Sequence, residues 1–119
     1  KAFKEASNHN GPSIVIAYAP CIAHGIVGGM ENSAKIESLA ATSGFFPLIR
    51  YNPLERKLII DSKNIDFNTY SDFIESQTRF TMLKEKNPEK YEKMIELSKQ
   101  EAVMRYQKYQ LLANDSKVV

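Results

Sequence analysis

The stretch 13-SIVIAYAP-20, followed by 21-CIAHGIVGGM-30, is the part of this sequence that decides the fold. Residues 13–19 form a continuous apolar run rich in β-branched side chains, with Gly-Pro before it and Pro20 after it. A run without polar alternation is typical of a strand that is buried on both faces, as in a parallel sheet. The sequence therefore predicts a buried strand over 13–19 within an α/β fold.

Regular elements are predicted on both sides of this strand. In chain order they are a helix over 1–8, a helix from Asn32 or Ser33 to about Ser43 with Gly44 at its cap, strands over 45–51 and 57–61, a helix from Asn68 or Thr69 to about Ser76, and a helix that begins at Asn87-Pro88. The turn at Asn52-Pro53 joins the two strands, which are therefore predicted to form a hairpin. The residues after Asn114 are expected to fray.

The last predicted helix carries a stripe that contains three tyrosines. Tyr91, Ile95, Ala102, Tyr106 and Tyr109 recur at helical spacing. The simpler interpretation is that this stripe packs onto the domain's own core. The alternative is docking onto another subunit or domain, because a tyrosine buries its ring while its hydroxyl keeps a hydrogen bond.

Length and composition favour one small globular unit. The chain has 119 residues, 43% of them hydrophobic and 25% charged, and a net charge of +2. That charge is too small to predict binding to nucleic acid or to an anionic membrane. No apolar run reaches the roughly 20 residues of a membrane helix.

The start of the chain lacks the apolar region of a signal peptide. It also has no Met and lies inside a predicted helix, so we expect a piece of a longer protein.

The one cysteine, Cys21, directly follows the predicted strand. A single cysteine excludes a disulfide framework and fits a reducing cytoplasm. Ligands collect at the carboxyl ends of strands in open α/β sheets, and the surrounding glycines let backbone N–H groups approach a ligand. The alternative is a buried small hydrophobic side chain, the commonest role of an isolated cysteine. One thiolate cannot hold an iron–sulfur cluster, which takes four ligands.

His24 lies three residues after the cysteine. It is interpreted either as a ring bonded to a backbone carbonyl or as a base that activates the thiol in a small thiol-dependent enzyme. The pair Gly28-Gly29 is a weak phosphate-binding signal, because it lacks both the Lys-Ser/Thr of a P-loop and the spacing of a dinucleotide-binding loop.

Four groups of residues, in order along nearly the whole chain, resemble one family. They are GPSIVIAYAPCIAHGIVGG over 11–29, IRYNP over 49–53, IDSK over 60–63, and the pairs Arg79-Phe80 and Leu83-Lys84. The chain is similar in these motifs to the C-terminal part of pyruvate:ferredoxin (flavodoxin) oxidoreductases. Position 23 is Ala where some relatives have Asn, and the link between the two hairpin strands is shorter than in many of them.

This resemblance implies a role for Cys21 alone among the residues present. The matching cysteine in the family is the fourth ligand of a [4Fe–4S] cluster, and the other three ligands lie upstream in the same domain. The thiamine-diphosphate and Mg²⁺ sites and the pyruvate-binding residues also lie upstream. The resemblance therefore implies no catalytic residue in this chain, and an isolated piece without turnover.

The resemblance also implies a domain division and an activity. Residues 1–53 are expected to be the end of a thiamine-diphosphate-binding-type α/β domain, and 54–119 a C-terminal extension. The expected activity of the parent is oxidative decarboxylation of pyruvate to acetyl-CoA and CO₂. Ferredoxin or flavodoxin would accept the electrons, coenzyme A would accept the acetyl group, and the parent would be a homo-oligomer. The alternatives are an oxidoreductase for another 2-oxoacid and a non-catalytic protein-interaction module.

Overall fold

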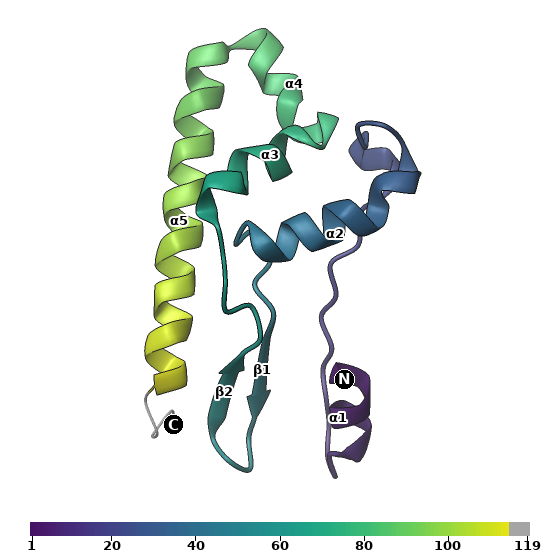
Figure 1. The fold of residues 1–119 in the computed structure, drawn as a ribbon, viewed down its shortest axis with the longest axis vertical. Helices are drawn as coiled ribbons and strands as arrows, with labels where there is room; N and C mark the ends of the chain where they lie inside the picture. The colour runs from purple at the N-terminus through teal and green to yellow at the C-terminus, as the bar shows by residue number, and fades with distance from the viewer. Residues whose placement is uncertain (115–119) are drawn as a thin grey trace.

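A computed structural model describes residues 1–114 as a mixed α/β structure (Figure 1). Its helices and strands are α1 (Ala2–Asn8), α2 (Ser33–Thr42), β1 (Ile49–Asn52), β2 (Lys57–Ile60), α3 (Tyr70–Glu75), α4 (Thr78–Lys86) and α5 (Pro88–Asn114). Short 3₁₀ turns cover Ile22–His24, Met30–Asn32 and Phe67–Thr69. The mixed α/β class with a hairpin and C-terminal helices is confirmed, whereas the predicted fraying lies outside the described residues.

The hairpin forms as predicted, although its first strand begins later. β1 and β2 pair antiparallel, with Ile49 opposite Ile60 and Asn52 opposite Lys57. The strand predicted over 45–51 was wrong at its start. Pro47 has no N–H for a ladder, and the Phe45 ring turns into the core, where its centroid lies 4.3 Å from that of Phe73.

The predicted buried strand over 13–19 is not a strand in this chain. Within the described residues the segment is extended but belongs to no sheet, and Ile14 and Ile16 are 87% and 77% exposed. In Figure 1 it runs as a coil between α1 and the start of the loop before α2. The prediction failed because a strand takes its backbone hydrogen bonds from a neighbouring strand, and none of the described residues 1–114 forms a strand beside this segment.

The far end of this segment is nevertheless attached to the molecule. The Tyr18 ring lies 5.9 Å from both Phe46 and Phe73, centroid to centroid, and its hydroxyl donates to Gln77 Oε1 over 3.4 Å. Pro20 is buried. Residues 18–20 therefore anchor the segment to the core, and the apolar residues before them are left outside.

Three predicted helix boundaries were tested by the structure. Gly44 has a φ of +83°, the left-handed conformation of a helix C-terminal cap. The Asn87 side chain accepts from the backbone N–H of Lys90 over 3.0 Å, which confirms the start of α5. Thr69 is the N-cap residue of α3, as predicted, although its side chain makes no capping hydrogen bond. Asp66 caps the 3₁₀ turn before α3, where its carboxylate accepts from the Asn68 N–H. Helix α4 was not predicted.

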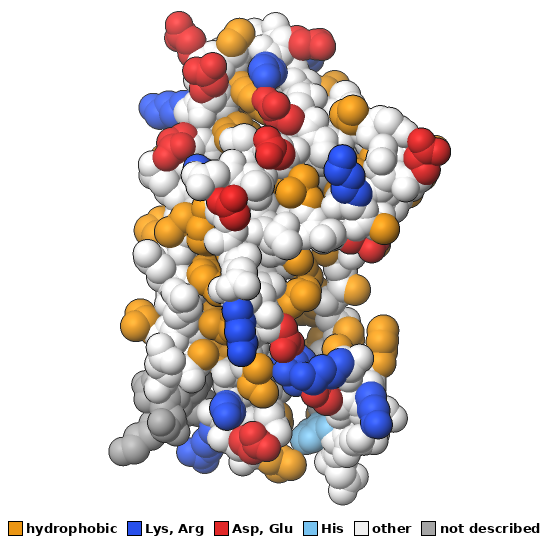
Figure 2. Space-filling model, in the orientation of Figure 1, with side chains coloured by type: hydrophobic (Ala, Val, Ile, Leu, Met, Phe, Trp, Pro, Cys, Tyr) orange, Lys and Arg blue, Asp and Glu red, His pale blue; other side chains and the backbone are white. Residues whose placement is uncertain are grey.

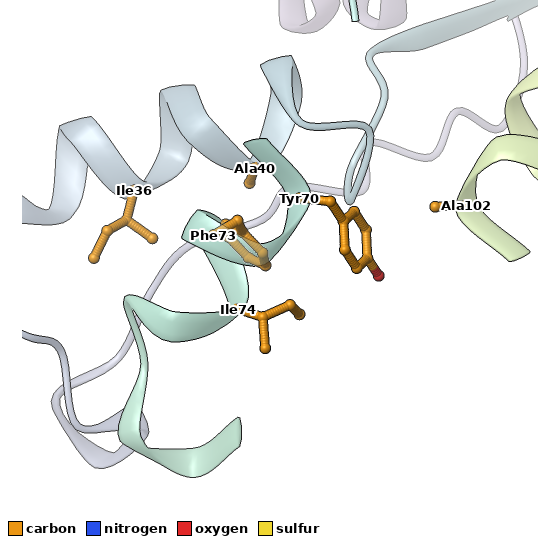
Figure 3. Packing of buried hydrophobic residues seen from close by; sticks show 6 residues of the cluster. All are labelled: Ile36, Ala40, Tyr70, Phe73, Ile74 and Ala102. Atoms are coloured by element: carbon orange, nitrogen blue, oxygen red, sulfur yellow. The ribbon is translucent and has the colours of Figure 1, made fainter. Parts of the chain in front are cut away.

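The core lies where α2, α3 and α5 meet. Its buried residues are Ile36, Ala40, Tyr70, Phe73, Ile74 and Ala102, shown in Figure 3. The α3 side chains, above all the fully buried Phe73, fill the space between the other two helices. Three more aromatic rings pack against Phe73 at the edge of this core. They are Tyr18 in a T-shaped contact and Phe45 and Phe80 in tilted contacts.

Helix α5 uses its tyrosine stripe to pack onto this core. Tyr91, Ala102 and Tyr106 are buried, and the Tyr106 hydroxyl donates to the Ser62 carbonyl over 2.7 Å. The Tyr70 and Ser98 hydroxyls share a hydrogen bond of 2.7 Å between α3 and α5. The interpretation that this stripe packs onto the domain's own core is therefore confirmed for these residues.

Candidate functional site

The loop that carries Cys21 is fastened to the junction between α3 and α4. The backbone N–H of Val27 donates to the Ser76 carbonyl over 3.0 Å, and the N–H of Thr78 donates to the Gly25 carbonyl over 2.8 Å. The Thr78 hydroxyl donates to the same carbonyl over 2.9 Å. These bonds form because Gln77 interrupts the two helices in an extended conformation and leaves backbone groups available.

Gly25 is the residue that lets the loop approach this junction so closely. Its φ is +66°, which disfavours any side chain, and an added Cβ would lie 2.7 Å from the Thr78 Cβ. Glycine here therefore serves both the left-handed turn after Ile22–His24 and the contact with α4.

Cys21 is exposed with a free thiol, at the beginning of the first 3₁₀ turn. The alternative of a buried hydrophobic cysteine is thus wrong for this chain. The sulfur accepts a hydrogen bond from the backbone N–H of His24, and the backbone N–H of Cys21 donates back to His24 Nδ1 over 3.2 Å. This reciprocal arrangement holds the thiol at the surface of a loop that is itself fixed at Gly25.

The His24 ring lies between the Cys21 backbone and Arg79 of α4. Its Nε2 is 3.1 Å from the Arg79 guanidinium, which also lies 4.4 Å from the centroid of the Phe80 ring. A guanidinium only donates, and a neutral imidazole has one acceptor nitrogen, so the ring accepts from Cys21 or from Arg79 but not from both. The expected bond from His24 to a backbone carbonyl is replaced by these contacts.

The arrangement does not support a thiol-dependent enzyme. Both imidazole nitrogens face partners other than the Cys21 sulfur, namely a backbone N–H and a guanidinium. Activation of the thiol requires a base in contact with it and a third group that orients the base. Arg79 was noted in the sequence only as part of a motif, and neither charge nor spacing predicted its contact with His24.

The loop offers one side chain suited to ligate an iron–sulfur cluster, the Cys21 thiol. A thiolate is the ligand that iron–sulfur clusters prefer, and an exposed thiol can reach a group outside the chain. Within residues 1–114, no group of three or more His, Cys, Asp or Glu side chains is placed to hold a metal ion. The other ligands of a cluster would have to come from outside this chain.

Arg50 joins two of the motifs that were noted in the sequence. Its guanidinium contacts the Asp61 carboxylate over 2.6 Å and, on its other side, Glu5 of α1 over 2.6 Å. Hydrogen bonding to Arg50 lowers the pKa of Asp61. The motif residues Arg50 and Asp61 therefore have a structural role, which is to hold α1 against the hairpin.

Comparison with known proteins gives a consistent set of relatives. The chain is 39% identical over 120 residues to "Pyruvate:ferredoxin oxidoreductase" of Moorella thermoacetica, a match that covers 95% of this chain and 10% of the relative. It is 36% identical over 118 residues to "Pyruvate-flavodoxin oxidoreductase" of a Nostoc species, covering 96% of the chain and 10% of the relative.

A third relative is named for a different activity. The chain is 37% identical over 93 residues to the mitochondrial "Pyruvate dehydrogenase [NADP(+)]" of Euglena gracilis, covering 74% of the chain and 5% of the relative. The chain thus spans about a tenth or less of the length of the curated relatives it matches.

No family model matches the sequence. Among the described helices, none combines the length and the apolarity needed to cross a membrane.

Proposed function

Because this chain is homologous over nearly its whole length to a segment of the pyruvate:ferredoxin and pyruvate-flavodoxin oxidoreductases, we propose that it serves as that segment in such an enzyme. Identity of 39% over 95% of the chain is the observation that carries the proposal. It favours this family over a stand-alone interaction module.

The proposed activity of the whole protein is oxidative decarboxylation of pyruvate to acetyl-CoA and CO₂. The electrons pass through iron–sulfur clusters to ferredoxin or flavodoxin, the two carriers that the relatives' names mention. Thiamine diphosphate with Mg²⁺ supplies the decarboxylation chemistry when bound, and its site lies in other parts of the protein. The proposed location is the cytoplasm, and the proposed assembly is a homo-oligomer.

Within this activity, Cys21 supplies one thiolate ligand to a [4Fe–4S] cluster. Three features of the chain support this role: the exposed sulfur, the 3₁₀ turn that orients it, and the hydrogen bonds from Thr78 that fix the loop at Gly25. A ligand on a rigid loop loses little conformational freedom when it binds, which favours a stable site. The Cys21 backbone and the His24 ring belong to the surroundings that orient the ligand.

We propose that residues 1–53 and 54–119 belong to two segments of the parent enzyme, a domain end and a C-terminal extension. These two segments share one hydrophobic core in this chain instead of having a core each. In this chain α2 precedes the division while α3 and α5 follow it, and all three contribute to one buried cluster. Arg105 of α5 also donates to the Phe45 carbonyl over 2.8 Å. The C-terminal extension is therefore expected to stabilise the loop-bearing half by direct packing.

The test is a comparison of Cys21→Ser with the unaltered native protein that contains this chain, purified without oxygen. We expect the variant to lose about four iron atoms per polypeptide, one [4Fe–4S] cluster, together with pyruvate-dependent reduction of ferredoxin or flavodoxin. Ile22→Ser is the matched control, since Ile22 is adjacent and 78% exposed. A full complement of iron in Cys21→Ser would contradict the ligand role.

The choice of 2-oxoacid needs a separate measurement. We expect the native protein to reduce its carrier with pyruvate faster than with longer 2-oxoacids under the same conditions. A preference for another acid would retain the family and the role of Cys21, and would replace the proposed substrate.

A further inference from the structure

Three buried side chains carry a polar atom without a hydrogen-bond partner among the described residues, namely Ser43 Oγ, Gln77 Nε2 and Tyr91 Oη. Of these, Gln77 is the one paired with the loop that carries Cys21, through a single β-bridge to Ile26. Such orphaned groups are rare in folded proteins and call for an explanation. The surface offers no comparable feature, because acidic and basic side chains are interspersed on the face shown in Figure 2, without a patch of one sign among its described residues.

Gln77 holds the loop on both sides of Cys21. Its backbone is extended between α3 and α4, and backbone hydrogen bonds made by its two neighbours attach residues 25–27, which follow the cysteine. Its side chain reaches the segment before the cysteine, where Oε1 accepts from the Tyr18 hydroxyl over 3.4 Å. Within the described chain, residues 14–20 make no other hydrogen bond. The 3₁₀ turn that presents the thiol therefore lies between two points that one residue fixes.

Stability alone does not account for an amide at this position. The Gln77 side chain is 0% exposed, its Nε2 is unpaired, and its Oε1 is paired over a distance that is long for two oxygens. An unpaired buried amide destabilises a fold, whereas an apolar side chain of the same length would fill the space without that penalty. What the amide adds is direction, because it fixes the Tyr18 hydroxyl and with it the path of the chain into Cys21.

We propose that Gln77 is a positioning residue for Cys21, which keeps the sulfur in the hydrogen bond that it accepts from the backbone N–H of His24. The proposal rests on the cluster-ligand role proposed above for Cys21. A hydrogen bond to a ligating sulfur stabilises the more negative, reduced form of a cluster and so raises its reduction potential. Gln77 makes no hydrogen bond to the sulfur in the described chain, so it acts through the path of the chain from Tyr18 to Ile26.

The test compares reduction potentials in the native protein that contains this chain, purified without oxygen. Cys21→Ser first identifies, by electron paramagnetic resonance, the cluster signal that depends on this ligand. Gln77→Met then replaces the amide by an apolar side chain of similar length, and Tyr18→Phe removes only the hydroxyl. We expect both variants to keep their iron and to shift that cluster about threefold toward its oxidised form at a fixed potential, a fall of about 28 mV for one electron.

The two variants should act through one contact. The double variant Gln77→Met/Tyr18→Phe is expected to show the same threefold shift as either single variant, because each substitution removes the same hydrogen bond. Additive shifts, about ninefold in the double variant, would overturn the proposal. Tyr51→Phe is the matched control, since Tyr51 is 50% exposed on β1 outside the loop, and it should leave the potential unchanged.

A merely structural role for Gln77 predicts a different result. Loss of packing would loosen the backbone bridge, so the amides of Val27 and Thr78 would exchange hydrogen faster, while any cluster retained would keep the wild-type potential. That outcome would overturn the proposal, under which both amides exchange within about twofold of the wild-type rate in Tyr18→Phe while the potential falls. Should Gln77→Met fail to fold, Tyr18→Phe decides, because it removes one oxygen and keeps the ring.

Failure of this proposal can be told apart from failure of the proposed function. If Cys21→Ser retains all its iron and every cluster signal, the ligand role is wrong and the positioning role falls with it. If Cys21→Ser loses one cluster while Gln77→Met and Tyr18→Phe keep the wild-type potential, the ligand role stands and only the positioning role is overturned.

Discussion

The helical core and the extended segment 13–19 are both rich in apolar residues, but only the core is buried within this chain. Phe73 of α3 is fully buried among three helices, whereas Ile14 is 87% exposed. A helix satisfies its own backbone hydrogen bonds and needs only side-chain partners, which a chain of this length supplies. A strand also needs a neighbouring backbone. The comparison teaches that apolar character alone does not bury a segment.

The largest change in stability is expected when the aromatic ring at the centre of the core, that of Phe73, is removed. Phe73→Ala should lower the free energy of unfolding of the 119-residue chain by about 3–5 kcal/mol, because the ring is buried and leaves a cavity between α2 and α3. Urea unfolding followed by circular dichroism measures the change. A loss below about 1 kcal/mol would show that these helices are not held by this core.

The next effect concerns the loop that links the two regions. Gly25→Ala should cost about 1–3 kcal/mol, since it strains a residue with positive φ and forces the loop away from Thr78. Hydrogen exchange should show faster exchange of the Thr78 amide as its bond to Gly25 is lost. Gly11→Ala is the control, because its added Cβ meets only the flexible His9 side chain. Equal effects of the two substitutions would contradict the role given to Gly25.

A smaller effect is expected from the ion pair where α1 meets the hairpin, and it should appear as a dependence of the free energy of unfolding on pH. The pKa of Asp61 is lowered by hydrogen bonding to Arg50, so the ionised pair stabilises the fold above the ordinary aspartate pKa of about 3.9. That stability is lost as the pH falls from this value through the lowered pKa of the folded state. Arg50→Gln should flatten the pH profile of stability in this acid range.

Lys35→Gln is the control for this experiment. Lys35 is exposed on α2, and its substitution removes one positive charge, as Arg50→Gln does, without altering the Arg50–Asp61 pair. An unchanged acid profile in Arg50→Gln would show that the pair contributes nothing measurable, as many surface ion pairs do.

The smallest effect in this chain is expected in the extended segment itself. Ile14→Ala should change the free energy of unfolding of the 119-residue chain by less than about 0.5 kcal/mol, because the side chain is already exposed. In the native protein we expect a loss of about 2–5 kcal/mol, on the expectation that a sheet from the remaining sequence covers the segment. Equally small losses in both settings would remove that expectation.

Several features of the molecule could be predicted from local sequence. The hairpin follows from two apolar runs around a turn, the start of α5 from Asn87-Pro88, and the end of α2 from Gly44. These are short-range preferences of backbone geometry and capping, which act within a few residues of one another. The mixed α/β class and the family resemblance belong to the same group of confirmed predictions.

The candidate site was predictable only in part. The sequence singled out Cys21 and His24 by residue type and position, and their mutual hydrogen bonds follow from a spacing of three residues. The cluster ligand role of Cys21 stays a prediction. Arg79 and Thr78 lie more than 50 residues away along the chain, so their contacts with His24 and Gly25 depended on how the helices pack.

By itself, the sequence determined which segments prefer to be helix or hairpin, where the caps fall, and which family the chain resembles, because these depend on nearby residues and on motif order. Only the tertiary structure decided that segment 13–19 is unpaired, that Cys21 is exposed, and that one stripe of α5 is buried. Burial and strand pairing depend on partners that are distant in the sequence, and local pattern carries no information about whether such partners are present.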